Sequence, residues 1–470
     1  LVANQIAYLV YAEPQKITQK ELFAKNVGEI VGVEPEELLS RITQEGIVWS
    51  TVARKVDEDH KTKLEQLKIE GLGFEKVNKR FYPEASMAAQ LLGFVASDES
   101  GEDIGYFGVE GSYNRELKGR DGSLVREKDA QGLPILLGEE KRFEPQNGRT
   151  VGLHIDKTVQ RIVETYLYRG IARYGAKEGS VVVLDPKTGG ILAMASYPSY
   201  DPRDFLTYPK ETYTNPIVGA TYEPGSTFKT LIMAAGLQEK VIKPDTKFDE
   251  KGPVQIGEYA IRTWNGEYHG EITMTEVLQH SSNVGMVFIG EKLGNDKLLS
   301  YINRFGFGKP TGIDLDEESA PSLRDTDQWK EIDYATATFG QGIAVTPIQM
   351  ISAVGALANE GRRMQPQLVK YIVESDEKVI DIKPKVLEKV VSPAAAKEIT
   401  EMMVYTVEQG EAKWTKARGY RIAGKTGTAQ IPVAGHYDAE KTIASFVGFG
   451  PADEARFVML VTLREPTSSP

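Results

Sequence analysis

The sequence predicts an α+β architecture, with candidate strands at the two ends of one domain and a helix-rich stretch between them. Two apolar runs, SVVVL (180–184) and ILAMAS (191–196), flank the turn sequence DPKTGG. Near the end of the chain, SFVGFG (445–450) and RFVMLVTL (456–463) flank PADEA. Both patterns are hairpin signals. A fifth candidate strand is RIAGKTGTAQI (421–431), and strands segregated from helices are typical of layered α+β domains.

At 470 residues, the chain is long enough for two or three domains. Its first part begins with the strand-like AYLVYA, and short helices are expected at 18–28 and 35–44. Thr18 and Glu21 form a capping-box signature at the first of these helices. No catalytic constellation stands out here, so we expect a scaffold or docking role.

RFEPQNGRT (142–150) has the polar composition, with Pro and Gly, of a linker. It divides the chain into an expected N-terminal domain of residues 1–149 and a larger domain of residues 150–470. The larger domain opens with IDKTVQRIVETYLYRGI, which we predict to be a helix.

YEPGSTFKTLIMAAGL (222–237) carries the first chemical motif. Its apolar residues recur at helical spacing, which predicts an amphipathic helix with one face in the core. Ser226 is expected at the helix N-terminus, with Lys229 one turn later on the same face. A serine becomes a useful nucleophile beside a base, and a lysine can serve if burial or a second cation lowers its pKa.

HSSNVGM (280–286) supplies a second motif. The Ser281 hydroxyl can relay a proton, and the Asn283 side chain has both a donor and an acceptor for a peptide amide. These are suitable groups for handling a peptide beside a nucleophilic serine.

AGKTGTAQ supplies a third motif, with Lys425, Thr426, Gly427 and Thr428 on a candidate strand. A second ammonium group at Lys425 would lower the pKa of Lys229 by like-charge repulsion, and it could steer a carboxylate. Gly427 has no side chain, so a substrate backbone could approach the strand closely. A peptide could then bind as an additional strand.

Each motif also occurs by chance elsewhere, at Ser375–Lys378, Ser112–Asn114 and Lys187–Gly189. None of the three is specific alone. The ordered set SxxK, SxN and KTG inside one domain is specific, and it occurs in penicillin-binding proteins and β-lactamases.

Composition excludes several other classes. The formal net charge of −11 argues against nucleic acid as a partner. The absence of cysteine excludes disulfides and thiol nucleophiles. The five histidines form no HxxxH or HExxH pair, so no metal or other cofactor is expected, and no GxSxG elbow is present. The sequence has no run of about 18 apolar residues, so we expect no membrane-spanning helix within it.

With these motifs in order, the chain resembles a class B penicillin-binding protein, a bacterial peptidoglycan D,D-transpeptidase. The resemblance rests on LDPKTGGILAMASYPSYDP, YEPGSTFK, the SSN stretch, FGFGKPTGIDL, FGQGIAVTPIQM and AGKTGTAQ. RFYPEASMAAQLLGF and GVEGSYNRELKGRDG resemble the N-terminal pedestal, or dimerisation-like, domain of that family. The resemblance to this family implies a mainly antiparallel five-stranded sheet flanked by helices. It also implies an active site where the Ser226 helix meets the KTG strand.

The resemblance also assigns roles. Ser226 would attack the penultimate D-Ala of a stem peptide after giving its proton to neutral Lys229. Ser281, with Lys425 behind it, would protonate the leaving D-Ala. The substrate would be held through Asn283, Thr426, Gly427 and Thr428, and the backbone N–H groups of Ser226 and Thr428 would form the oxyanion hole.

The expected partners are peptidoglycan stem peptides, β-lactams that acylate Ser226, and a lipid-linked glycan polymerase of the division or elongation machinery. The chain begins at Leu1 rather than Met, so we expect a membrane anchor to be missing. The protein would lie at the bacterial cytoplasmic membrane with its catalytic domain outside. Asn283 favours the division (septal) type, because the elongation type more often carries Asp there. Two departures are that the family's opening pedestal motif would lie before Leu1, and that a helix of the family would follow Pro470.

Three other functions remain open from sequence. A serine β-lactamase shares the motifs but needs a deacylating base, and no additional Glu motif follows the SSN stretch. A D,D-carboxypeptidase would use water in place of an acceptor amine. A β-lactam-sensing module would bind without turnover, and the pedestal-like leader argues against it.

Overall fold

The computed structural model describes residues 1–99, 101–127, 135, 140–319, 321–410, 412–433 and 436–468. Its contacts divide the chain into two compact units, Leu1–Ala85 and Ser86–Pro470. The second unit holds all residues to which the sequence assigns chemistry. The expected boundary between residues 149 and 150 falls inside the second unit, and as a statement about domain organisation it stays a prediction.

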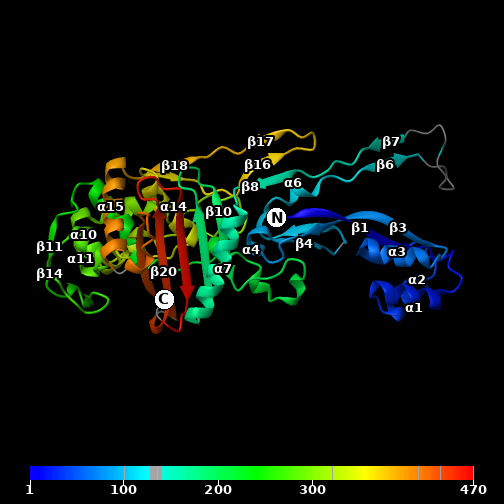
Figure 1. Ribbon diagram of the computed structural model, residues 1–470, viewed down its shortest axis with the longest axis horizontal. Helices are drawn as coiled ribbons and strands as arrows, with labels where there is room; N and C mark the ends of the chain where they lie inside the picture. The colour runs from blue at the N-terminus through cyan, green and yellow to red at the C-terminus, as the bar shows by residue number, and fades with distance from the viewer. Residues whose placement is uncertain are drawn as a thin grey trace. The chain divides into compact units, whose positions relative to one another are not determined.

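Three antiparallel strands form the sheet of the first unit, in the order β2-β1-β3 (Figure 1). The expected AYLVYA strand lies inside β1, and both expected short helices are present. The elements are β1 (Ala3–Ala12), α1 (Lys20–Val31), α2 (Pro35–Ile42), β2 (Ser50–Val56), α3 (Glu58–Gln66) and β3 (Leu72–Phe81).

The capping box predicted for the first helix is wrong. Helix α1 begins at Lys20, its N-cap residue is Gln19, and no side chain caps it. The helix therefore starts later than the Thr18 pattern requires, so the threonine hydroxyl is not at the N-cap position.

The first part of the second unit packs on the remainder through aromatic rings. Phe94 stacks on Phe205 with ring centroids 4.0 Å apart, and Tyr200 and Tyr213 belong to the same buried cluster. The Tyr200 hydroxyl donates to the Ala89 carbonyl at 3.0 Å. The elements of this part are α4 (Ala89–Leu92), β4 (Phe94–Ser97), β5 (Asp103–Tyr106), α5 (Gly108–Ser112), α6 (Asn114–Lys118), β6 (Ser123–Arg126) and β7 (Glu140–Phe143).

The linker predicted at 142–150 is instead part of the packed structure. Arg120 and Gln146 exchange two backbone hydrogen bonds of 2.9 Å, and the Arg149 N–H donates to the Glu116 carbonyl at 2.7 Å. Strand β8 (Thr150–Leu153) then pairs with β16 in the sheet β17-β16-β8. The Pro, Gly and polar residues of the segment 142–150 make close backbone contacts. The prediction of a linker, which used composition alone, did not include these contacts.

The five predicted strands form one antiparallel sheet, in the order β10-β9-β21-β20-β19. Both predicted hairpins are confirmed, and the KTG strand lies at the edge of the sheet. The strands are β9 (Glu178–Leu184), β10 (Ile191–Tyr197), β19 (Ala423–Val433), β20 (His436–Gly450) and β21 (Phe457–Arg464).

Helices cover both faces of this sheet (Figure 1). The predicted helix α7 (Lys157–Tyr174) begins at the N-cap Asp156 and packs through Val163 and Leu167 onto β9 and β10. On the other face, α14 (Pro347–Ala358) packs on β9 and β21, and α15 (Pro393–Gln409) packs on β19. The remaining strands and helices of the second unit are β11 (Lys247–Glu250), β12 (Val254–Ile256), β13 (Tyr259–Ile261), β14 (Gly270–Thr273), β15 (Arg362–Met364), β16 (Val369–Val373), β17 (Val379–Asp381), β18 (Val386–Lys389), α8 (Pro216–Gly219), α9 (Lys229–Gln238), α10 (Met274–Gln279), α11 (Asn283–Leu293), α12 (Asn295–Arg304) and α13 (Glu331–Ala337). The short 3-10 turns are η1 (Phe205–Thr207), η2 (Lys210–Thr212), η3 (Gly225–Thr227), η4 (Thr326–Gln328) and η5 (Lys413–Thr415).

The central helix α9 differs from the amphipathic helix that the sequence predicts. Every residue from Lys229 to Leu237 is buried, so the helix has no solvent face. It packs against α11, α12, α14 and α15. A helix that is apolar all round belongs inside a large core, and the buried residues here include Lys229.

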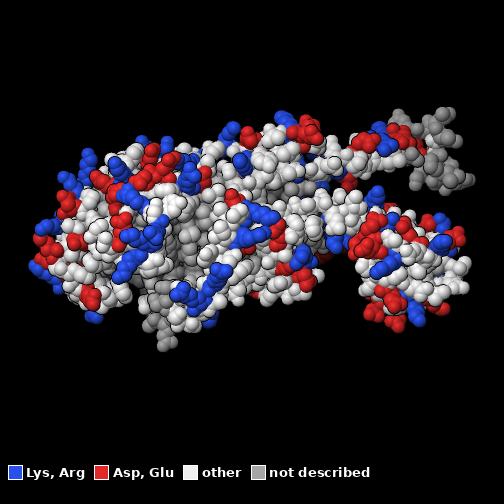
Figure 2. All heavy atoms as spheres, viewed as in Figure 1, with Lys and Arg blue, Asp and Glu red and all other residues white. Residues whose placement is uncertain are grey.

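The surface carries both signs of charge. On the face shown in Figure 2, Lys and Arg side chains are interspersed with Asp and Glu. Within the described ranges, no helix is long and apolar enough to cross a membrane. The same residues contain no group of three or more His, Asp or Glu side chains placed to hold a metal ion.

Asp314 ties three segments of the second unit together, and its removal should destabilise that unit. Its carboxylate accepts hydrogen bonds from the Leu368 and Val369 N–H groups at 2.6 and 2.8 Å, and from the Tyr113 hydroxyl at 2.9 Å. Burial and the Asp314 charge raise the pKa of Tyr113. We predict that Asp314→Ala lowers the free energy of unfolding by about 2–4 kcal/mol, because partly buried donors lose their acceptor.

Calorimetry would show this loss as a lower unfolding temperature for the second unit. Asp381→Ala, at an exposed position on β17, is the matched control and should change stability by less than about 0.5 kcal/mol. Equal effects of the two substitutions would contradict the role given to Asp314.

Candidate active site

Ser226 lies on the turn η3, which leads directly into the buried helix α9. The Thr227 hydroxyl donates to the Pro224 carbonyl at 2.7 Å, and the Phe228 N–H donates to the Gly225 carbonyl at 2.9 Å. These bonds close the turn. The Ser226 side chain is thereby held at the N-terminal side of α9, where backbone N–H groups favour negative charge.

The chain entering this turn is fixed by the loop at 340–345. Tyr222 and Val345 exchange two backbone hydrogen bonds of 2.9 Å, and the Gly225 N–H donates to the Gly340 carbonyl at 3.0 Å. The Tyr222 hydroxyl is buried without a hydrogen-bond partner in the described part of the chain, and burial raises its pKa. Its raised pKa keeps the phenol neutral.

Lys229 brings the SxxK and SxN motifs together. Its side chain is fully buried. Its Nζ atom donates to the Ser281 carbonyl at 2.5 Å and to Asn283 Oδ1 at 2.8 Å, and lies 3.2 Å from Ser281 Oγ. Segments more than fifty residues apart in sequence therefore meet at one amine.

The SSN segment forms a tight turn between α10 and α11. Ser281 has φ +56°, a left-handed conformation that is uncommon for a residue with a side chain. Ser282 is the N-cap of α11 and accepts a hydrogen bond from the Gly285 N–H at 2.9 Å. The Asn283 Nδ2 atom donates to the Arg262 carbonyl at 2.9 Å, which fixes the amide so that its oxygen points to Lys229.

The KTG segment lies on the edge strand β19. Lys425 is fully buried, and its Nζ donates to the Thr426 carbonyl at 3.0 Å. Thr426 is half-buried and Thr428 is exposed, and strand alternation presents both of these hydroxyl-bearing residues on the same side. Lys425 Nζ also contacts the Thr426 hydroxyl, at 3.4 Å.

Gly427 allows the KTG strand to approach the Ser226 turn. A Cβ atom at this position would lie 2.9 Å from Thr227 Cγ2 and 2.7 Å from Ser445 Oγ. A Cβ atom at Gly225 would lie 3.1 Å from the Thr428 carbonyl oxygen. From the sequence we expected Gly427 to allow the approach of a substrate. In the structure the close contact is made by the Ser226 turn of the protein itself. A role for Gly427 toward substrate stays a prediction.

The chance copies of the motifs lie elsewhere in the second unit and have ordinary partners. Lys378 pairs with Glu374 beside the β16–β17 connection, and Lys187 pairs with Glu454 at the β9–β10 turn. The structure also places groups at the site that no motif indicated. These are Glu250, whose carboxylate contacts Ser282, and the Arg262 carbonyl that holds Asn283. Glu250 stands in the polar run KFDEKG, which carries no sequence signal of burial.

Two family models match the chain. The model of the penicillin-binding protein transpeptidase domain matches residues 179–470, and that of the penicillin-binding protein dimerisation domain matches residues 1–153. Stage V sporulation protein D of Bacillus subtilis is 33% identical over 99% of this chain and 72% of its own length. Peptidoglycan D,D-transpeptidase FtsI of Escherichia coli is 31% identical over 88% of this chain and 68% of its own.

Solved structures agree with these matches. Penicillin Binding Protein 2X of Streptococcus thermophilus superposes with a TM-score of 0.83 at 25% identity, covering 100% of this chain and 75% of that one. Penicillin binding protein 3 of Mycobacterium tuberculosis complexed with ampicillin gives a TM-score of 0.74 at 32% identity, covering 83% of this chain and 84% of that one.

The packing of the 340–345 loop on the Ser226 turn can be tested with two glycines. Gly340 has φ +78°, and a Cβ atom there would lie 2.3 Å from the Gly225 carbonyl oxygen. Gly342 has φ +72°, but the nearest heavy atom to its Cβ would be 3.5 Å away. We predict that Gly342→Ala costs about 1–2 kcal/mol from backbone strain alone. Gly340→Ala should cost about 1–3 kcal/mol more from overpacking.

Thermal unfolding of the two variants measures this difference directly. If Gly340→Ala were no less stable than Gly342→Ala, the loop would not be pressed against the turn as described.

Proposed function

This chain belongs to the class B penicillin-binding proteins, the peptidoglycan D,D-transpeptidases, and on that premise we propose that Ser226 is its nucleophile and Lys229 its general base. The observation that carries this proposal is the fully buried Lys229, one turn from Ser226, with its Nζ held by Ser281 and Asn283. A serine acquires nucleophilic strength from a base in this position.

The contacts of Lys229 suit a neutral amine. The Ser281 carbonyl and Asn283 Oδ1 can only accept hydrogen bonds. A neutral amine can donate its two N–H bonds to these two oxygens, and its lone pair can take a proton from a hydroxyl; the Ser281 hydroxyl also lies 3.2 Å from Nζ. Burial favours the uncharged form of an amine. In the proposed step the Ser226 proton passes to this lone pair as Oγ attacks the carbonyl of the penultimate D-Ala of a stem peptide.

The second half of the acylation step uses the SxN and KTG motifs. As the bond to the terminal D-Ala breaks, Ser281 gives its proton to the leaving amine and regains one from Lys229. The positive charge of Lys425 would stabilise the Ser281 oxygen during this transfer. The amine of a second stem peptide then attacks the acyl group, which forms the cross-link and releases Ser226. Two backbone donors, at Ser226 and Thr428, would stabilise the oxyanion, and each is worth about 3–4 kcal/mol.

The edge position of β19 supports the proposed peptide site. An edge strand has unpaired backbone groups along one side, so an extended peptide can bind there by strand addition. Thr426 and Thr428 would bind the terminal carboxylate, and Asn283 would hold the peptide amide. β-Lactams would bind at the same strand edge and acylate Ser226. The M. tuberculosis relative is described in complexes with ampicillin and aztreonam.

The cellular setting is proposed from the family. We place this protein at the bacterial cytoplasmic membrane, with a lipid-linked glycan polymerase as its partner. Asn283 favours the division type. A sporulation-specific role is the second candidate, because the B. subtilis relative is named for stage V of sporulation.

The roles of Ser226 and Lys229 predict a clear set of labelling results. Ser226→Ala should reduce covalent labelling by a fluorescent penicillin below about one-thousandth of wild type. Lys229→Ala should slow acylation about 10²- to 10⁴-fold through loss of the base. Lys378→Ala, which alters the lysine of the other SxxK match, should acylate at the wild-type rate.

Mass spectrometry after penicillin treatment would map the adduct. An adduct on any residue other than Ser226, or undiminished labelling of Ser226→Ala, would remove the proposed nucleophile.

The transpeptidase reaction predicts a stable acyl-enzyme with penicillin and a cross-linked product with natural peptides. When donor and acceptor stem peptides are supplied together, dimers should accumulate, as measured by liquid chromatography with mass detection. Free D-Ala without dimers would indicate a carboxypeptidase. Rapid turnover of penicillin would indicate a β-lactamase, and binding with no product at all would indicate a sensing module.

A further inference from the structure

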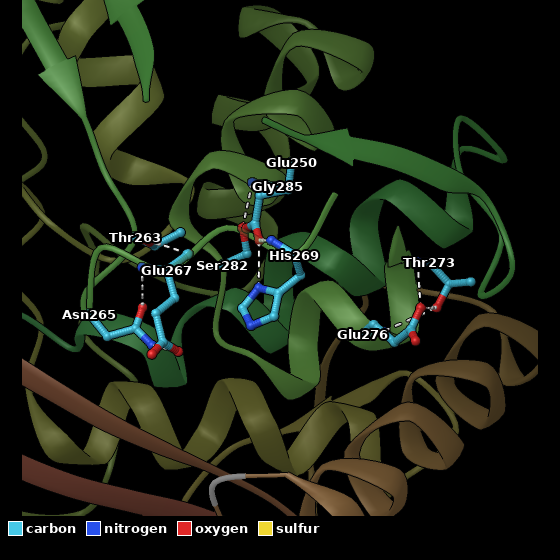
Figure 3. A network of polar contacts seen from close by, with 9 residues as sticks. All are labelled: Glu250, Thr263, Asn265, Glu267, His269, Thr273, Glu276, Ser282 and Gly285. Atoms are coloured by element: carbon cyan, nitrogen blue, oxygen red, sulfur yellow. Dashed lines mark hydrogen bonds and ion pairs between the residues drawn. The ribbon is translucent and has the colours of Figure 1, made fainter. Parts of the chain in front are cut away.

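A buried carboxylate lies beneath the SSN turn. Glu250 ends strand β11, and its side chain is fully buried. Figure 3 shows it pointing toward Ser282 and His269. A buried charge is stable only where hydrogen bonds replace its hydration, so the partners of Glu250 indicate what it holds.

Glu250 accepts three hydrogen bonds. The Ser282 hydroxyl donates to Oε1. The His269 backbone N–H and ring Nδ1 both contact Oε2, at 3.0 and 2.8 Å. Because an ionised carboxylate can only accept, the His269 ring must carry its proton on Nδ1. Both carboxylate oxygens are therefore occupied by donors from two separate segments of chain.

The Ser282 hydroxyl has no freedom left to rotate. It donates to Glu250 and accepts from the Gly285 N–H, the N-cap bond of α11. Glu250 also lies at the N-terminal end of this helix, where the macrodipole favours a negative charge. The carboxylate therefore fixes the middle residue of the SSN turn and the start of the helix that follows.

The residues on either side of Ser282 are the ones that face Lys229. Ser281 offers its carbonyl from a left-handed backbone conformation, which costs energy and persists only when neighbouring contacts impose it. Asn283 offers its side-chain oxygen. A rotation of Ser282 would displace both acceptors together, since they are its immediate neighbours in the chain.

A ring stack fixes the other end of the turn. His280 is the C-cap of α10 and directly precedes Ser281. Its ring stacks on that of His269, with centroids 4.0 Å apart and planes 20° apart. His269 thus contacts both Glu250 and the residue before the turn.

We propose that Glu250, oriented by His269, is a positioning residue for the acylation step: through the Ser282 hydroxyl it holds Ser281 and Asn283 in contact with Lys229. It touches no substrate in this scheme. The inference rests on the proposed roles of Ser226 and Lys229 and adds to them the group that sets their geometry.

The expected signature is a larger change in the rate of acylation than in the strength of initial binding. In Glu250→Gln the amide offers a single acceptor oxygen in place of two, so Ser282 and the His269 ring compete for it. We expect the first-order acylation constant for a fluorescent penicillin to fall at least tenfold. The dissociation constant of the non-covalent complex should rise by less than the acylation constant falls, because Asn283 is the one proposed substrate-binding residue that depends on Glu250.

Glu276→Gln is the matched control. Glu276 caps α10 by accepting from the Thr273 N–H and hydroxyl, both at 2.7 Å, and it lies in the same part of the fold (Figure 3). Its loss should lower the unfolding temperature while leaving the acylation constant within twofold of wild type. A purely structural role for Glu250 would give the same pattern as this control.

A second pair of variants keeps the test decisive if Glu250→Gln does not fold. His269→Asn can keep an N–H near the position of Nδ1, whereas His269→Ala cannot. We expect His269→Asn to retain most of the acylation rate and His269→Ala to lose at least fivefold. Equal rates for these two variants and wild type, or an unchanged acylation constant in folded Glu250→Gln, would overturn the proposal.

The site of the adduct and the rate of its formation test the nucleophile and the positioning residue separately. Mass spectrometry of penicillin-treated wild type and Glu250→Gln should place the adduct on Ser226 in both. An adduct elsewhere would refute the proposed nucleophile. An adduct on Ser226 formed at equal rates in both would refute the positioning role alone.

Discussion

The burial of one amine sets the requirements for the rest of the second unit. Lys229 lies on a helix with no solvent face, so its Nζ needs partners from the protein. These partners are Ser281 and Asn283. The chain between α10 and α11 brings both acceptors to Nζ by turning at Ser281, which has a left-handed conformation. The packing of the core, the conformation of the turn and the position of Lys229 therefore depend on one another.

Much of this could be predicted because the decisive signals are local. The strands β9, β10, β20 and β21 are short apolar runs around turn sequences, and the helix α7 has a regular apolar period. The order of SxxK, SxN and KTG pointed to a common site, and the structure brings Ser226, Lys229 and Asn283 into one region. The edge position of β19 was not visible in its own residues, since strand order depends on long-range pairing.

The failures share a cause, which is that composition does not report environment. The segment at 142–150 has linker-like residues but forms backbone hydrogen bonds with α6 and its surroundings. Thr18 and Glu21 have the spacing of a capping box, but the helix starts at Lys20. Glu250 stands among charged residues and is nevertheless buried. For residues 142–150 and for Glu250, contacts with other parts of the chain decided the outcome.

The way that residues 86–149 are bound into the second unit determines where this protein can be shortened. Removing everything before residue 150 would remove Phe94 and Ala89 from the aromatic cluster. It would expose the apolar surface of Tyr200, Phe205 and Tyr213 to water. Such a fragment would tend to precipitate during purification. Removing only the first unit, up to Ala85, leaves those rings covered and gives crystallographers and inhibitor screens a more manageable starting point.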